Sequence, residues 1–283
     1  MIQSLSYFDE IIAYKKKRVA QQQVITPLAS LRALSKMQDR PRDVSTVLRE
    51  EQVALFSHVI NPNSSLGQPL SGTAAYDPVA LARRLVRQGA QALVVSTDSR
   101  YDGGSIEHLT LVSSAVDVPV VRHDYILDEY QIVETRAAGG DGLFLYPAML
   151  SGEQLRRLIS ATQRNLMTVI ACVHNREELL AVLPYEPRIV AINNHDPRTD
   201  QTDLTLTSQL VELIPGHMTV ITMGGLESPW DVVQVATGVD GVLVKQAMLL
   251  IPSTARSLRQ VLGLNGYVSS TENGESLTTN PFL

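Results

Sequence analysis

The 283-residue sequence holds a single cysteine, Cys172, and aromatic residues make up only 5% of it. One cysteine excludes a disulfide bond within the chain and favours a reducing compartment. The N-terminus has no basic segment followed by an apolar stretch, so the sequence predicts no signal peptide. Apolar runs such as residues 240–244 are far too short to cross a bilayer. Together these absences predict a cytoplasmic protein that does not associate with a membrane.

The sequence also lacks a basic stripe. Its formal net charge is −5, and no run of Lys and Arg alternates with aromatic side chains, so nucleic acid is not favoured as a partner. The one basic block, Lys15 to Arg18, falls on an expected helix and is interpreted as a solvated helix face. The rest of the composition, 44% hydrophobic and 19% charged, is typical of a globular chain that buries a large core.

Eight short aliphatic runs recur along the chain, separated by stretches with helical spacing. Continuous apolar character is typical of parallel strands that are covered on both faces. Several intervening stretches carry helix-start signals, as at Ser151, Asn175 and Ser228. The expected strands lie near residues 53–59, 92–96, 118–121, 142–146, 168–173, 189–192, 219–222 and 241–244.

This alternation favours an α/β fold of the (β/α)8 TIM-barrel type over a doubly wound sheet, because no Gly-x-Gly-x-x-Gly turn follows the first strand. Before the barrel, one helix is expected to begin at Ser6 and a second over residues 27–34, followed by a polar connector over residues 35–43. We therefore expect one barrel domain over residues 1–264, with an N-terminal helical extension over about residues 1–45. Residues 265–283 are polar and lack a periodic apolar face, which predicts a disordered tail.

In such barrels the reacting side chains lie at the C-terminal ends of the strands. Four histidines are expected there: His58, His123, His174 and His195. Imidazole can act as an acid or a base, or as a zinc ligand. Neither a His-x-His nor a His-Glu-x-x-His spacing occurs, so we expect no metal and no other cofactor. We interpret His174 as a hydrogen-bonded structural residue.

The last two strands and the fifth offer further candidates. Gly224-Gly225 follows the seventh expected strand and precedes a helix start at Ser228, an arrangement that can hold a phosphate by backbone N–H groups. Lys245 follows the eighth strand, where it can either attract an anion or fill its place. Cys172 is a candidate nucleophile by position alone, and a lone thiol on a strand is more often a small buried hydrophobe.

Several segments of the chain resemble the indole-3-glycerol-phosphate synthase family. The run Arg122-His123-Asp124-Tyr125 is similar to the family's Arg-Lys-Asp-Phe, and Ile192 to Asp196 is similar to its Ile-Asn-Asn-Arg-Asp segment. Residues 5–12, 97–105 and 134–141 extend the resemblance, which covers residues 5–262 in the same order. It implies a TIM barrel preceded by extra helices. It also implies a reaction that closes an indole ring on a carboxyphenylamino deoxyribulose phosphate, with loss of carbon dioxide and water.

The resemblance also places the family's reacting groups on this sequence. His123 stands where the family has its lysine acid, and Asn193 keeps the family's asparagine, so these two residues are the catalytic candidates. The other reacting groups of the family are a lysine, a serine and three glutamates. Their positions hold His58, Ile60, Cys172, Met223 and Gly224 in this chain.

Substrate-binding positions follow from the same resemblance. Gly225 and the aromatic contact Tyr125 are retained, while Asp102 replaces a second aromatic residue. Lys245 and His195 stand in place of a glycine and an arginine of the family's phosphate site. Ser65, in the segment after the first strand, completes the set. The expected substrate-binding residues are His58, Ser65, Tyr125, Cys172, His195, Gly224, Gly225 and Lys245.

Three hypotheses about function follow. The first is a divergent member of the family that lacks the ordinary ring-closing decarboxylation and either binds a related phosphorylated metabolite or serves as a partner of another protein. The second is an active synthase, a carbon–carbon lyase of tryptophan biosynthesis, that uses His123 and Asn193. The third is a metal-dependent hydrolase that uses His58, His123 and His195. One general acid supplies about 10²–10⁴-fold of acceleration, which makes the ordinary mechanism a poor match to these residues.

Overall fold

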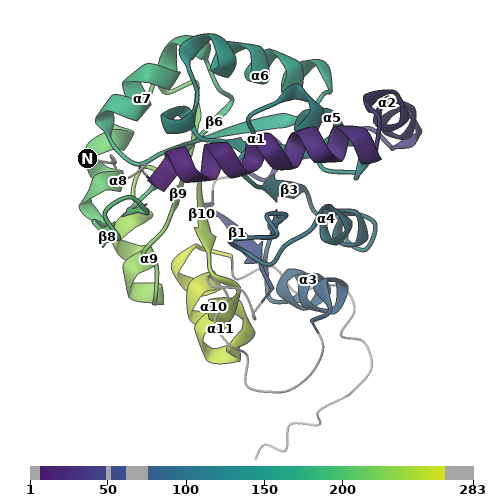
Figure 1. Ribbon diagram of the computed structural model, residues 1–283. Coiled ribbons are helices and arrows are strands. Elements are labelled where there is room, and N and C mark those ends of the chain that lie inside the picture. Colours follow the sequence, from purple (N-terminus) through teal and green to yellow (C-terminus); the bar gives the residue numbers. More distant parts are fainter. Residues whose placement is uncertain (1–6, 49–51, 62–75, 265–283) are drawn as a thin grey trace, which may run out of the picture.

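Eight parallel strands close into a barrel in the computed structural model, which describes residues 7–48, 52–61 and 76–264 (Figure 1). Around the barrel the strand order is β1-β10-β9-β6-β5-β4-β3-β2. The barrel strands are β1 (Ala54–Val59), β2 (Ala92–Ser96), β3 (Val120–His123), β4 (Gly142–Leu145), β5 (Thr168–Val173), β6 (Ile189–Asn193), β9 (Thr219–Met223) and β10 (Gly241–Val244). A short antiparallel ribbon after β6 consists of β7 (His195–Asp196) and β8 (Gln201–Thr202).

Helices follow the strands and surround the barrel (Figure 1). They are α3 (Pro78–Arg87), α4 (Ile106–Ser113), α5 (Glu129–Ala137), α6 (Gly152–Arg164), α7 (Arg176–Val182), α8 (Thr205–Val211), α9 (Pro229–Val235), α10 (Gln246–Leu250) and α11 (Pro252–Val261). Single turns of 3-10 helix are η1 (Val44–Thr46), η2 (Pro147–Met149) and η3 (Leu183–Tyr185). Side chains of Ser151, Asn175 and Ser228 cap α6, α7 and α9, as the sequence predicts. The predicted TIM barrel is therefore confirmed.

The two-residue period of the strands decides which side chains reach the mouth of the barrel. Inward-facing residues such as Phe56, Val121 and Ile170 form an inner core cluster, because alternate residues of a strand share a face. Two residues further along the same strands come His58, His123 and Cys172, at the C-terminal ends. The outward-facing residues pack in a second cluster against the helices. Candidate residues on different strands are thus brought to one end of the barrel.

Two helices precede the barrel: α1 (Tyr7–Ile25) and α2 (Leu28–Met37). Figure 1 shows α1 lying across the barrel. Its residues Phe8 and Ile11 pack in the same core cluster as Tyr146 and Met149, which follow β4, so α1 covers part of the barrel mouth. The expected extension is present, but the second helix runs to Met37, beyond the predicted end at residue 34. Part of the expected polar connector is therefore helical.

One sequence-based expectation about α1 is wrong. Lys15, assigned to a solvated face, is only 5% exposed, whereas Lys16, Lys17 and Arg18 are exposed as expected. Lys15 is the member of the block that falls on the buried side of the helix with Ile11 and Val19. Within the described residues, no helix has the length and apolar character needed to cross a membrane. The predicted tail, residues 265–283, lies outside the described residues.

Candidate functional site

The barrel mouth centres on His123, the last residue of β3. Its Nε2 atom lies 2.6 Å from the hydroxyl oxygen of Tyr146, which follows β4. Its Nδ1 atom lies 3.7 Å from Oδ2 of Asp102 in the loop after β2. Burial raises the pKa of Tyr146 well above its usual range, so its hydroxyl keeps its proton and can donate it to Nε2. Nδ1 then carries the ring proton on the side facing Asp102.

Asp102 is held as a carboxylate in this buried position. It is 4% exposed and accepts a hydrogen bond from the hydroxyl of Ser96. Burial alone would raise the pKa of Asp102, but the neighbouring His123 and the Ser96 hydroxyl outweigh burial and lower it. The carboxylate faces the Nδ1 edge of His123 at 3.7 Å. Asp102, His123 and Tyr146 therefore form a set that can supply and recover a proton.

His58, on β1, packs beside His123. Its ring centroid is 5.2 Å from that of His123. Burial, followed by the adjacent His123, lowers the pKa of His58 to about 3, although the charge of Asp102 acts in the opposite direction. His58 is therefore neutral at physiological pH. Its Nε2 atom is buried without a hydrogen-bond partner in the described structure, which leaves it free to meet a polar group of a ligand.

Three more positions of the family's reacting groups lie at the strand ends, as predicted. None of the side chains at these positions carries a charge in this chain. Cys172 is fully buried, and burial raises the pKa of its thiol, with a further rise from the nearby charge of Glu178. The thiol therefore stays protonated, which disfavours a nucleophilic role. Met223 is 5% exposed at the end of β9. Ile60 is held by its backbone, since Gln246 of α10 both accepts from its N–H and donates to its carbonyl at 2.9 Å.

Asn193, the retained asparagine, fixes the turn after β9. Its Oδ1 accepts from the backbone N–H of His195 at 3.2 Å. Gly224 adopts a φ of +75°, and a Cβ atom there would meet Asn193 Oδ1 at 1.9 Å. Gly224 is thus required both by its left-handed backbone and by the close approach of Asn193. Gly225 is likewise left-handed, with a φ of +69°.

The predicted phosphate cradle combines the Gly224-Gly225 turn, the start of α9 and Lys245. The start of α9 is occupied by its own residues, because Asp231 accepts from the N–H groups of Glu227 and Ser228 at 3.0 and 2.8 Å. These two N–H groups are therefore satisfied by a side chain, and phosphate binding at this turn stays a prediction. Lys245 is exposed and forms an ion pair with Glu227. Gly224-Gly225 and Lys245 remain as candidates.

His195 and Tyr125 lie at the edge of the mouth. His195 Nδ1 lies 3.2 Å from the hydroxyl of Thr202, across the ribbon β7–β8, and its Nε2 lies 3.6 Å from Asp200. Tyr125 packs on Tyr146, with 5.4 Å between ring centroids. Ser65 lies outside the described residues. No group of three or more His, Cys, Asp or Glu able to hold a metal occurs in the described ranges, so the hydrolase hypothesis lacks its ligand set.

His174 packs on Tyr146 and is held by Glu178. Its Nδ1 lies 2.9 Å from Glu178 Oε2, and Arg198 contacts the other oxygen of Glu178 at 2.9 Å. The His174 ring stacks on Tyr146, with 6.1 Å between centroids and 17° between planes. The arrangement agrees with the interpretation of His174 as a hydrogen-bonded structural residue. It also fixes the ring whose hydroxyl contacts His123.

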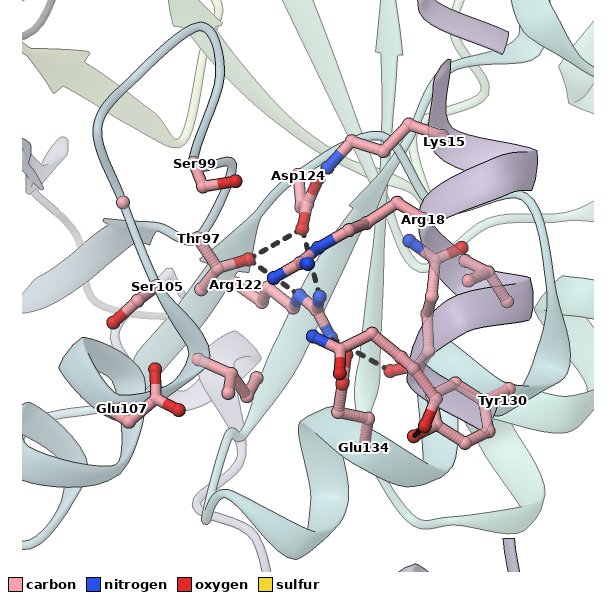
Figure 2. Close-up of a pocket in the computed structure, with 15 residues that line it drawn as sticks. Lys15, Arg18, Thr97, Ser99, Ser105, Glu107, Arg122, Asp124, Tyr130 and Glu134 are labelled. Atoms are coloured by element: carbon pink, nitrogen blue, oxygen red, sulfur yellow. Dashed lines mark hydrogen bonds and ion pairs between the residues drawn. The ribbon is translucent and has the colours of Figure 1, made fainter. Parts of the chain in front are cut away.

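A buried ionic cluster ties α1 to the loops of the site (Figure 2). Lys15 pairs with both Asp98 and Asp124, and Arg122 bridges Asp124 and Glu134 at 2.9 Å each. Burial opposes the charge on Lys15, but the two carboxylates outweigh it and raise its pKa. Figure 2 shows Lys15 and Arg18 projecting from α1 toward Asp124 and Arg122, beside a cavity of about 100 Å³. Asp98 precedes Asp102 in the loop after β2, and Asp124 directly follows His123.

Two site residues, Tyr146 and Asp102, are absent from the sequence-based set. Tyr146 ends the fourth expected strand, and the rule that strand ends carry the chemistry identifies the position but not its contact with His123. Asp102 was interpreted as the loss of an aromatic contact. The spacing from Ser96 to Asp102 contains no sequence signal that these two side chains meet, because the contact depends on how the loop after β2 folds back.

The eight parallel strands and the polar side chains at their C-terminal ends define a TIM barrel whose candidate site lies at the barrel mouth. A family model described as indole-3-glycerol phosphate synthase matches residues 8–261. The synthase of Roseiflexus sp. (strain RS-1) is 32% identical over 265 residues, which cover 90% of this chain and 97% of that protein. The synthase of Kineococcus radiotolerans is 34% identical over 248 residues, which cover 87% of this chain and 90% of that protein. The chain belongs to the indole-3-glycerol phosphate synthase family.

A solved structure agrees on the fold. A thiamine phosphate pyrophosphorylase from Pyrococcus furiosus superposes with a TM-score of 0.56, covering 75% of this chain and 96% of that chain. At 17% sequence identity this likeness concerns the barrel alone.

Proposed function

We propose that the barrel mouth binds a phosphorylated metabolite of the substrate class on which the synthase family acts, and that His123 is its acid–base group. The observation that carries the proposal is the position of His123 between the Tyr146 hydroxyl and the Asp102 carboxylate. Nδ1 of His123 has no hydrogen-bond partner in the described structure, so its proton can pass to a substrate and be recovered from solvent. The family's acid is a lysine at this position, so the chemical role is retained with a different side chain.

The first candidate reaction is ring closure by the synthase reaction itself. The loss of water in this reaction requires a proton on the departing oxygen, which His123 supplies. Asn193 keeps its place at the end of β6 beside the Gly224 turn. The names of the relatives favour this candidate, since proteins that align with about nine-tenths of the chain are called synthases.

The second candidate is binding of such a metabolite without ring closure. This candidate is favoured by the apolar character of three replaced positions. Ile60, Cys172 and Met223 are buried and neutral, so they cannot stabilise a positive charge that develops on the substrate. A ligand would then be held by contacts to His58, Tyr125 and the Gly224-Gly225 turn.

One experiment distinguishes the candidates. Purified protein is incubated with carboxyphenylamino deoxyribulose phosphate, and the fluorescence of the indole product is followed beside a calorimetric titration. Turnover that disappears in His123→Ala supports the synthase. Saturable binding without turnover supports the second candidate. The proposal fails if the protein neither binds nor converts this compound, or if turnover is unchanged in His123→Ala.

A further inference from the structure

We infer a second ligand site at the opposite, N-terminal end of the barrel, which takes a small organic anion: a carboxylate or phosphate ester joined to an apolar body. A cleft of about 450 Å³ lies between the beginning of β5, the turn that joins α6 to β5, and the segment before η1. This volume is within the range of about 300–1,000 Å³ for small-molecule pockets. Thr168, the first residue of β5, lines the cleft, whereas Cys172 of the same strand lies at the mouth.

The charge of the cleft favours an anion. Arg40 and Arg188 both line it, and the one acidic side chain among its lining residues is Asp43. Arg188 Nη1 lies 3.3 Å from Asp43 Oδ1, and the Arg188 side chain is 59% exposed. Asp43 is also engaged by the N–H and hydroxyl of Ser45. Arg40 is exposed and forms no ion pair within the described ranges. A locally positive cleft therefore exists on a chain of net charge −5.

An apolar wall faces these arginines. Leu166, Met167 and Pro41 line the cleft, and Leu166 is 63% exposed. A guanidinium forms paired hydrogen bonds with carboxylate or phosphate oxygens, while the apolar wall contacts the rest of a ligand. The combination explains why the expected ligand has both an anionic group and an apolar body, unlike a free inorganic ion.

The backbone of Leu166 gives a second, independent observation. The residue has a φ of +60° and follows the C-cap Asn165 of α6. The N–H of Met167 donates to the carbonyl of Thr162, and the N–H of Leu166 donates to that of Gln163. These are the two bonds of a Schellman motif, whose left-handed position is usually glycine. Leucine there is strained, yet its side chain is mostly exposed and lines the cleft. Residues held in sparsely populated backbone regions cluster at active sites and ligand clamps.

The site is tested with fluorine NMR, using para-fluorobenzoate and para-fluorophenyl phosphate as probes. We expect saturable binding of at least one probe, and the comparison between them identifies the preferred anion. Arg40→Gln and the double variant with Arg188→Gln should weaken binding, by about tenfold or more in the double variant. Arg32→Gln, an exposed arginine on α2, is the matched control and should leave binding unchanged.

Further variants separate this site from the barrel mouth. His123→Ala should leave probe binding unchanged; weakening in His123→Ala but not in Arg40→Gln would place the probe at the mouth and overturn the inference. Leu166→Gly should raise the melting temperature by about 2–4 °C, because the strain is released, and should weaken probe binding. Absence of saturable binding, or equal competition by inorganic phosphate alone, would also overturn it. Because Arg40 has no ion pair to lose within the described structure, Arg40→Gln is expected to fold normally.

Discussion

The Nε2 atom of His123 lies 2.6 Å from the hydroxyl oxygen of Tyr146, which joins the ends of β3 and β4 at the centre of the barrel mouth. Because burial keeps Tyr146 protonated, the phenol orients the imidazole and leaves Nδ1 facing Asp102. In the proposed function, the substrate then receives its proton from Nδ1 of His123.

His123→Ala should lower any turnover by about 10²–10⁴-fold, because the acid–base group is lost. Tyr146→Phe should lower it by only about 3–10-fold, since it removes one neutral hydrogen bond. The measurement is steady-state turnover of the synthase substrate, with circular dichroism as the check on folding. An equal and small effect of the two substitutions would contradict a central role for His123.

His58 should make the fold sensitive to acid. Its folded pKa of about 3 lies below the unfolded value near 6.5, so below pH 6.5 the unfolded chain binds a proton that the folded chain does not. This contribution to stability is fully present above pH 6.5 and is lost, at about 1.4 kcal/mol per pH unit, as the pH falls toward 3.

Urea unfolding between pH 4 and 7 measures this dependence. We expect His58→Gln, which cannot titrate, to flatten the slope relative to the parent chain. His217→Gln, at an exposed histidine, is the control and should leave the slope unchanged. The same slope in the parent chain and in His58→Gln would show that His58 titrates normally.

Lys15→Met should destabilise the fold by about 3–5 kcal/mol, because it leaves the carboxylates of Asp98 and Asp124 buried without their shared cation. Lys16→Met, at the exposed neighbour, should cost less than about 0.5 kcal/mol. Chemical denaturation measures both. Similar small values for the two variants would show that the buried cluster contributes no net stability.

Gly224→Ala should abolish activity or ligand binding at the mouth, because the added Cβ overlaps Asn193 Oδ1 and the residue has a left-handed φ. Gly216→Ala is the matched control, since a Cβ there meets nothing within 4 Å. Both variants are compared by thermal unfolding and by titration with the synthase substrate. Normal binding by Gly224→Ala would exclude the turn after β9 from the site.

Glu227→Gln should strengthen phosphate binding by about 2–5-fold, because it releases Lys245 from an exposed ion pair worth about 0–1 kcal/mol. Lys245→Gln should weaken it. Calorimetric titration with inorganic phosphate tests both variants. If Glu227→Gln leaves the affinity unchanged, Lys245 does not contact the anion.

Local sequence determined the barrel. The aliphatic runs that predict strands coincide with seven of the eight barrel strands to within one residue at either end. They do so because a strand that is buried on both faces consists of a continuous run of aliphatic residues. The prediction for the third strand begins too early, because the pattern favours residues 118–121 whereas β3 covers Val120–His123. Ser151, Asn175 and Ser228 likewise predicted their helix starts, because capping involves residues three apart.

Only the tertiary structure decided which side chains meet at the barrel mouth. The sequence placed His58, His123 and Asn193 at strand ends, but Tyr146 and Asp102 contact His123 from other elements, and Lys15 reaches Asp98 and Asp124 from a helix more than eighty residues away. These side chains meet because barrel closure and the packing of α1 across the mouth bring distant segments together. Contacts of that kind leave no local spacing in the sequence, so the sequence determined which candidate residues lie at the strand ends and the fold determined which side chains they meet.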